Sequence, residues 1–176
     1  MSADLTGLAA RCLDLLRRRG STLATAESLT AGLVCSTLAE VPGASDVLRG
    51  GVAAYATDVK TRVLGVPRVV VAEHGVVSAE CAAAMAAGAR SLLGATWAVA
   101  TTGVAGPSRQ DGLPVGTVYV AVAGPGAVRQ RRLALPGGRA DIRHGSVCAV
   151  LELLDGVLSE TPGSLADDCA VEEESR

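Results

Sequence analysis

Residues 96–135, TWAVATTGVAGPSRQDGLPVGTVYVAVAGPGAVRQRRLAL, hold the pattern that decides the fold. The apolar run 96–102 is typical of a strand buried on both faces. A Gly- and Pro-rich loop, 103–115, follows it. Two further strands are expected at 116–123 and 127–135, joined by Gly124-Pro125-Gly126, which is typical of a hairpin turn.

Strands and helices alternate on the N-terminal side of this stretch. Strands are expected at 22–26 and 49–55, helices at 4–19, 29–40, 58–64 and 79–93, and an extended run, Val69 to Ala72, within the connecting segment 67–77. Ser78 is placed to cap the helix 79–93, and a last helix is expected over 139–158. Strands alternating with helices, plus one hairpin, predict a three-layer α/β/α sandwich with a mixed, mostly parallel sheet.

The chain length of 176 residues indicates one domain. We expect this domain over residues 1–158, followed by an acidic, apolar-poor tail, 159–176, whose composition predicts disorder. The core must be aliphatic, because the sequence has no Phe and a single Trp. The Ala-rich helix 79–93 suits packing within the domain or against a second subunit, so a homo-oligomer stays open.

Composition argues against several classes of partner. The net charge is −2 and the basic residues form no long run, so no nucleic acid is expected. No signal peptide and no uncharged membrane-spanning stretch is visible, which predicts a cytoplasmic protein without a membrane partner. The five cysteines, at 12, 35, 81, 148 and 169, form no CxxC. The first four lie within apolar, helix-like runs, which predicts buried free thiols. The two histidines, His74 and His144, lie far from any cysteine pair, so no metal site is expected.

Small and polar residues follow three of the expected strands. The segments are Thr25 to Ser28, Tyr55 to Lys60, and Thr102 to Pro107. Because sites in open α/β sheets form beyond the carboxyl ends of strands, these segments are expected to converge. The convergence is the main signal for a functional site.

Ser28 is a candidate nucleophile. A serine between a strand and a helix is most often an N-cap, and that alternative stays open. The amides of a helix N-terminus would, however, offer Ser28 a ready oxyanion site. Neither histidine stands at a strand end, so the base is expected to be a lysine, as in Ser-Lys variants of the catalytic triad.

Lys60 is the candidate base. It is expected near the start of helix 58–64, with Thr57 as N-cap, where a cation opposes the helix dipole and its pKa falls. It is the only lysine of the chain, and the other fifteen basic residues are arginines, which cannot deprotonate. A solvated surface lysine is the alternative. Tyr55 is placed to relay a proton or hold the lysine, or else is a strand-end tyrosine with a wet hydroxyl.

Several long motifs, in order, resemble one family. They are TAESLTAGLV (25–34), VPGASDVLRGGVAAYATDVKTRVLGV (41–66), HGVVSAECAAAMAAGAR (74–90), ATTGVAGPSRQDGLPVGTVYVAVA (100–123) and GGRADIR (137–143). Over residues 5–158 the chain is similar to the CinA C-terminal domain family, also known as nicotinamide-nucleotide amidohydrolases. The resemblance implies hydrolysis of nicotinamide mononucleotide to nicotinic acid mononucleotide and ammonia, a step of pyridine nucleotide salvage and NAD metabolism.

The resemblance also implies the site residues. The nucleophile falls on Ser28, the base on Lys60 and an assisting hydroxyl on Tyr55. Substrate-binding positions fall on Thr30, Thr102, Gly103, Ala105, Gly106, Arg139 and Arg143. The two arginines, four apart on one helix face, are expected to hold the nucleotide phosphate at the helix N-terminus, although solvated or salt-bridged arginines are the alternative. No cofactor or metal is expected.

The sequence departs from the family pattern in places. Leu29-Thr30-Ala31-Gly32 stands where the family often has Cys-Thr-Gly-Gly, and Ala56-Thr57 where it often has Ser-Asn. The altered loop 108–112 puts the substrate preference in doubt. The larger N-terminal domain of many relatives, with its pyrophosphatase activity, is expected to be absent. Two other functions stay open: a non-catalytic nucleotide-binding or competence- and DNA-damage-associated module, and an amidase for another small pyridine or amide.

Overall fold

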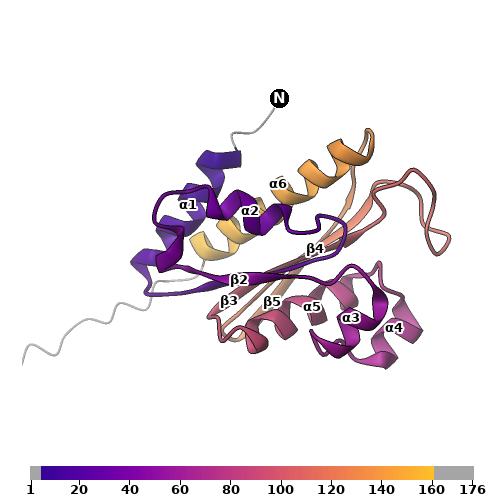
Figure 1. The fold of residues 1–176 in the computed structure, drawn as a ribbon, viewed down its shortest axis with the longest axis horizontal. Helices are drawn as coiled ribbons and strands as arrows, with labels where there is room; N and C mark the ends of the chain where they lie inside the picture. The colour runs from indigo at the N-terminus through magenta and orange to yellow at the C-terminus, as the bar shows by residue number, and fades with distance from the viewer. Residues whose placement is uncertain (1–4, 161–176) are drawn as a thin grey trace, which may run out of the picture.

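One five-stranded sheet organises the protein (Figure 1). The structure is a computed structural model that describes residues 5–160. The strands are β1 (Leu23–Glu27), β2 (Leu48–Ala53), β3 (Trp97–Gly103), β4 (Thr117–Gly124) and β5 (Ala127–Ala134), in the order β2-β1-β3-β4-β5. β1 pairs in parallel with β2 and β3, and β4 pairs antiparallel with β3 and β5. Every strand except β4 therefore runs in the same direction, which confirms the mixed, mostly parallel sheet.

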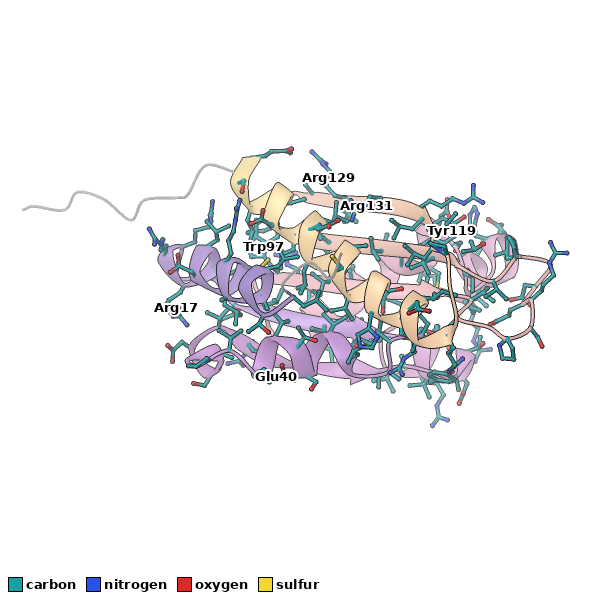
Figure 2. All side chains as sticks on the ribbon, turned by 90° about the horizontal axis from the view of Figure 1, so that it is seen from above. Arg17, Glu40, Trp97, Tyr119, Arg129 and Arg131 are labelled. Carbon is teal, nitrogen blue, oxygen red and sulfur yellow. The ribbon has the colours of Figure 1, made fainter. Side chains whose placement is uncertain are left out.

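Helices cover both faces of this sheet. They are α1 (Leu5–Arg18), α2 (Leu33–Ala39), α3 (Thr57–Arg62), α4 (Arg68–His74), α5 (Ala79–Leu92) and α6 (Arg139–Glu160), with a short 3-10 helix, η1 (Ala44–Asp46). α1, α2 and α6 lie on one face, seen from above in Figure 2, and α3, α4 and α5 lie on the other. The three-layer α/β/α arrangement follows the prediction.

The two faces pack differently. Large aliphatic side chains fill the layer under α1, α2 and α6, among them Leu13, Leu38 and Ile142. The layer under α5 is built mostly of alanines from the helix and from β1, β3 and β4. Small side chains let α5 lie close to its neighbours, so this helix packs within the domain. At Gly88 of α5, an added Cβ would lie 1.8 Å from the Leu64 carbonyl oxygen.

The expected extended run over residues 69–72 is wrong, because this segment is helical and belongs to α4. The amides of Val70 and Val71 donate to the carbonyl of Pro67 and begin the helix. Valine favours strands where a neighbouring strand can pair with it. The segment packs on α5 instead, and this tertiary setting overrides the propensity.

Two expected helix starts are also wrong. α2 begins at Leu33, because Ala31 and Gly32 have left-handed φ angles of 51° and 96° and form part of a turn over residues 28–32. The N-cap of α3 is Ala56, without a side-chain cap, and Thr57 is already helical. The expected cap at Ser78 is confirmed, since its Oγ accepts from the Cys81 amide. α6 extends through Glu160, so residues 159 and 160 are helical, and the rest of the expected tail lies outside the described residues.

Residues 5–160 also test the expectations about membrane-spanning helices and cysteines. None of the helices formed by residues 5–160 is long and apolar enough to cross a membrane. Cys12 and Cys81 are buried as expected, whereas Cys35 and Cys148 are only half-buried, and these four thiols are free. Burial raises the pKa of Cys12 to about 12, so this thiol stays protonated.

Candidate functional site

The carboxyl ends of β1, β2 and β3 meet around a cavity of about 130 Å³. The loop after β3, which contributes to the lining of the cavity, extends to the right in Figure 1. Because these three strands are parallel, the segments that follow them converge as the sequence indicated. Most residues singled out from the sequence line the cavity, namely Ser28, Tyr55, Lys60, Thr102, Gly103, Ala105, Gly106 and Arg139, whereas Thr30 and Arg143 do not.

Lys60 is buried at the floor of this site, with 2% of its surface exposed. The alternative of a solvated surface lysine is therefore wrong. Nζ donates to the carbonyls of Ala54, at 2.8 Å, and Tyr55, at 3.1 Å. Burial lowers the pKa of the amine from its ordinary value of 10.5, and the nearby Cys81 opposes this more weakly. In its neutral form such an amine has two N–H groups and one lone pair, so two carbonyl acceptors occupy both N–H groups and leave the lone pair to accept a proton.

Ser28 follows β1 directly and is half-buried. Its amide donates to the Thr101 carbonyl, at 3.0 Å, and its own carbonyl accepts from Ala31, at 3.2 Å. Within residues 5–160 its hydroxyl makes no hydrogen bond, either to a helix amide or to Lys60. The N-cap alternative is wrong, because the N-cap of α2 is Gly32. The main chain of Ser28 is fixed while its hydroxyl stays available.

Glu27, the residue before Ser28, was not singled out from the sequence. Glu27 is 1% exposed, and its carboxylate accepts four hydrogen bonds. The donors are the amides of Gly32, Val34 and Cys35, at 2.9, 3.0 and 2.8 Å, and the hydroxyl of Thr25, at 3.1 Å. A carboxylate before a helix is a capping signal, but the signal is legible only once the helix is known to begin at Leu33.

Tyr55 and Arg139 join three segments at the cavity. Arg139 Nη2 donates to the Tyr55 hydroxyl, at 2.8 Å, and Nη1 donates to the Gly106 carbonyl, at 2.9 Å. These bonds connect the end of β2, the loop after β3 and the start of α6. Tyr55 is 56% exposed, and its phenol bonds to Arg139. Lys60 bonds to the main-chain carbonyl of Tyr55 and not to its hydroxyl.

Thr30 and Arg143 lie behind the turn that carries Ser28. Arg143 Nε donates to the Leu29 carbonyl, at 3.0 Å, and Nη2 to the Thr30 carbonyl, at 2.7 Å. The fully buried Thr30 pairs its hydroxyl with that of Thr101, at 2.7 Å. Arg143 thus bonds to the main chain of the turn, and Thr30 connects the turn to β3. Thr102, which does line the cavity, donates to the Val76 carbonyl, at 2.6 Å.

Among the described residues, no group of three His, Cys, Asp or Glu side chains is placed to hold a metal ion. The site offers a hydroxyl, a buried amine with a lowered pKa, and a guanidinium beside a phenol.

The fold and this cavity define an α/β/α protein with a serine and a buried lysine at the carboxyl ends of its parallel strands. The model of the CinA C-terminal domain matches residues 5–158, and the chain belongs to this family.

Relatives and solved structures agree with this assignment. A CinA-like protein of Frankia casuarinae is 50% identical over 152 residues, which are 86% of this chain and 35% of that protein. The chain therefore spans about a third of that relative. The crystal structure of the competence damage-inducible protein A of Klebsiella pneumoniae has a TM-score of 0.87 at 30% identity, over 91% of this chain and 100% of that one. A competence/damage inducible protein of Agrobacterium tumefaciens has a TM-score of 0.85 at 35% identity, over 91% and 98%.

Proposed function

We propose that this protein hydrolyses the carboxamide of nicotinamide mononucleotide to nicotinic acid mononucleotide and ammonia, as a step of pyridine nucleotide salvage. The observation that carries the proposal is the pairing of Ser28 and Lys60 around one cavity. The only lysine of the chain is buried there with a lowered pKa, beside a serine whose hydroxyl has no partner in the described residues. A Ser-Lys hydrolase requires a serine hydroxyl and, at the same site, a lysine whose amine gives up its proton readily.

The reaction runs through an acyl-enzyme. Neutral Lys60 takes the Ser28 proton as Oγ attacks the carboxamide carbon, and the carbonyl electrons move onto oxygen. When the tetrahedral intermediate collapses, the C–N bond breaks and the proton goes to the departing ammonia. Water, deprotonated by the same amine, then attacks the ester and releases the acid and Ser28. The hydrogen bond between Ser28 and Lys60 forms in the substrate complex, because catalytic hydrogen bonds often tighten only there.

The cavity lining supports a nucleotide substrate. Arg139, at the start of α6, supplies a cation where the phosphate of the mononucleotide would bind. Thr102, Gly103, Ala105 and Gly106 form the wall against which the pyridine would lie. The positive charge of the pyridinium makes the carboxamide carbon more electrophilic, so the reaction needs no metal. Tyr55, whose hydroxyl accepts from Arg139, assists by orienting this cation as well as by any proton transfer.

A substrate panel tests the proposal. Wild-type protein and the Ser28→Ala variant are incubated with nicotinamide mononucleotide, nicotinamide riboside, nicotinamide and a non-pyridine amide, and ammonia and the acid product are measured. We expect one ammonia per nicotinic acid mononucleotide with wild type and none with the variant. Binding of the mononucleotide without ammonia release would favour a non-catalytic nucleotide-binding module. Hydrolysis of a different amide alone would favour an amidase of other specificity.

A further inference from the structure

The turn over residues 28–32 is held by hydrogen bonds on both sides of its main chain. On the amide side, Ser28 donates to Thr101, Ala31 to Ser28, and Gly32 to the Glu27 carboxylate. On the carbonyl side, Leu29 and Thr30 accept from Arg143. The left-handed φ of Ala31 costs free energy for a residue with a Cβ. Such a conformation persists only where its surroundings enforce it.

The Glu27 carboxylate has no capacity left for chemistry. Oε2 accepts from the amides of Gly32 and Val34, and Oε1 accepts from the Cys35 amide and the Thr25 hydroxyl. Two bonds on each oxygen fill the lone-pair sites of a carboxylate. Glu27 is also 1% exposed and does not line the cavity. It therefore has neither access to a substrate nor a free lone pair with which to act as a base.

The amide of Leu29 is the exception in this turn. Leu29 is 3% exposed and lines the cavity, yet its N–H has no acceptor among residues 5–160. Buried amides are nearly always paired, and an unpaired one carries a desolvation cost. In hydrolases whose serine follows a strand, the amide after the nucleophile binds the oxyanion. A substrate oxygen would supply the acceptor that the Leu29 amide lacks.

We propose that Glu27 and Arg143 are positioning residues for the turn that carries Ser28. Glu27 fixes the turn from its amide side and Arg143 from its carbonyl side, so that the Leu29 N–H faces the substrate oxyanion of the tetrahedral intermediate. The inference rests on the proposed function and adds to it the residues that align the nucleophile. It assigns Arg143 to the turn, and it leaves the phosphate to Arg139.

Two variants test this assignment by kinetics. Glu27→Gln keeps the size of the side chain but replaces one acceptor oxygen with an N–H group that faces main-chain amides. Arg143→Met removes the bonds to Leu29 and Thr30 while keeping an extended side chain. Both should lower kcat by about tenfold to several hundredfold, the scale of a displaced oxyanion donor, and leave KM for the mononucleotide unchanged. The control is Arg131→Met, since Arg131 also donates to a main-chain carbonyl, that of Ala149, but does not line the cavity.

A second readout does not depend on amide hydrolysis. A fluorophosphonate forms a P–O bond to Ser28 Oγ as its P–F bond breaks; the Ser28 proton passes to Lys60 and fluoride leaves. The phosphoryl oxygen on the tetrahedral phosphorus needs the same donor, and intact-mass spectrometry measures the rate of labelling. Both variants should label more slowly than wild type, in step with kcat, and Ser28→Ala should not label. If wild type labels quickly and the variants slowly, but no nicotinamide compound releases ammonia, the positioning role holds and the proposed substrate is wrong.

Several outcomes overturn the inference. Labelling and kcat at wild-type level in both variants would show that Glu27 and Arg143 serve folding alone. A raised KM for the mononucleotide in Arg143→Met, with kcat and labelling unchanged, would return Arg143 to phosphate binding. Absence of Ser28 labelling in folded wild-type protein would remove the nucleophile itself. If Glu27→Gln does not fold, as judged by circular dichroism, Arg143→Met decides the outcome.

Discussion

Ser28 and Lys60 act as one unit in the proposed reaction, so removing either should remove most of the rate. Ser28→Ala and Lys60→Arg should each lower kcat for nicotinamide mononucleotide by roughly a thousandfold or more, and the double variant should be little worse than either single one. An arginine in place of Lys60 stays protonated and so cannot accept the Ser28 proton. Steady-state kinetics measures the loss, and circular dichroism checks the fold. Near-normal turnover by Lys60→Arg would show that Lys60 is not the base.

The ionisation of Lys60 predicts the pH dependence. Only the neutral amine can accept the Ser28 proton, so kcat/KM should rise with pH and level off above the pKa of Lys60, which burial places below 10.5. The sign for stability is the same. Between the folded pKa and 10.5 the unfolded chain binds more protons, so the free energy of unfolding should increase with pH across that interval. Activity that falls as pH rises from neutral would contradict the assignment.

Arg139 provides the test of phosphate recognition. Arg139→Ala should raise KM for nicotinamide mononucleotide by about tenfold or more, the scale of one lost charge-assisted hydrogen bond. The effect on nicotinamide riboside, which lacks the phosphate, should be small. Arg131→Ala is a matched control, because Arg131 lies beside α6 on β5 (Figure 2) and bonds to Ala149 and Glu152. Equal losses on both substrates would assign Arg139 to folding or catalysis.

At the scale of residues, the sequence was most informative about side chains with unusual chemistry. A lone lysine and a serine after a strand could be singled out, because their types limit what they can do. Glu27 could not be, since its role depends on where α2 begins. The sequence placed Arg143 on the same helix as Arg139, one turn further on. It carries no sign that the Arg143 guanidinium bonds to the Leu29 and Thr30 carbonyls.

At the scale of elements, the contact between α5 and the segment after α3 is the sharpest steric constraint. Gly88→Ala would place a methyl group against the Leu64 carbonyl and force the helix away from it. This should destabilise the protein by about 1–3 kcal/mol, a loss of several degrees in Tm. Since the Val66 amide also bonds to the Lys60 carbonyl, the shift should lower activity as well.

Gly156→Ala in α6 is the matched control for Gly88. Apart from its chain neighbours and the backbone of α6 itself, no atom lies within 4 Å of a Cβ added there, so the exchange relieves only the entropic cost of a helical glycine. It should stabilise the protein by about 0.5–1 kcal/mol. Thermal unfolding measures both variants. A Gly88→Ala protein as stable as Gly156→Ala would show that α5 can move without cost.

The elements themselves could be predicted where one physical signal dominated. Buried strands such as β3 and the capped helix α5 follow the sequence closely, because apolar runs and a side-chain cap act locally. The helix α4 could not be predicted, because its valines favour a strand and only its packing on α5 makes it helical. The start of α2 could not be predicted, because the left-handed turn depends on hydrogen bonds to the Glu27 carboxylate and from Arg143, which is distant in sequence.

At the scale of the whole molecule, the order of alternating strands and helices was enough to predict three layers, since each parallel connection must cross a face of the sheet. The difference in side-chain size between the two faces of the sheet was not predicted. One face of the sheet is covered by large aliphatic side chains and the other mostly by alanines. Which side chains meet on each face depends on the register of β1 with β2 and β3, which the sequence pattern leaves open.

The absence of a metal cluster among the described residues leads to a prediction for the complete protein. Deamidation of the mononucleotide should survive incubation with EDTA followed by its removal, because serine, lysine and the main chain carry every proposed step. Ammonia release before and after the treatment measures this. Loss of activity that zinc or manganese restores would contradict the Ser-Lys mechanism.

Because Lys60 is the only lysine, the protein has a single side-chain amine, and that amine is enclosed. Endoproteinase Lys-C can therefore cut this sequence only at one internal bond, and only when the region around α3 opens. The rate of that cleavage into two fragments measures how often the cavity comes apart in the native protein. Occupation of the cavity by a nucleotide should slow the cut, so a protease and a gel can report binding with no label attached.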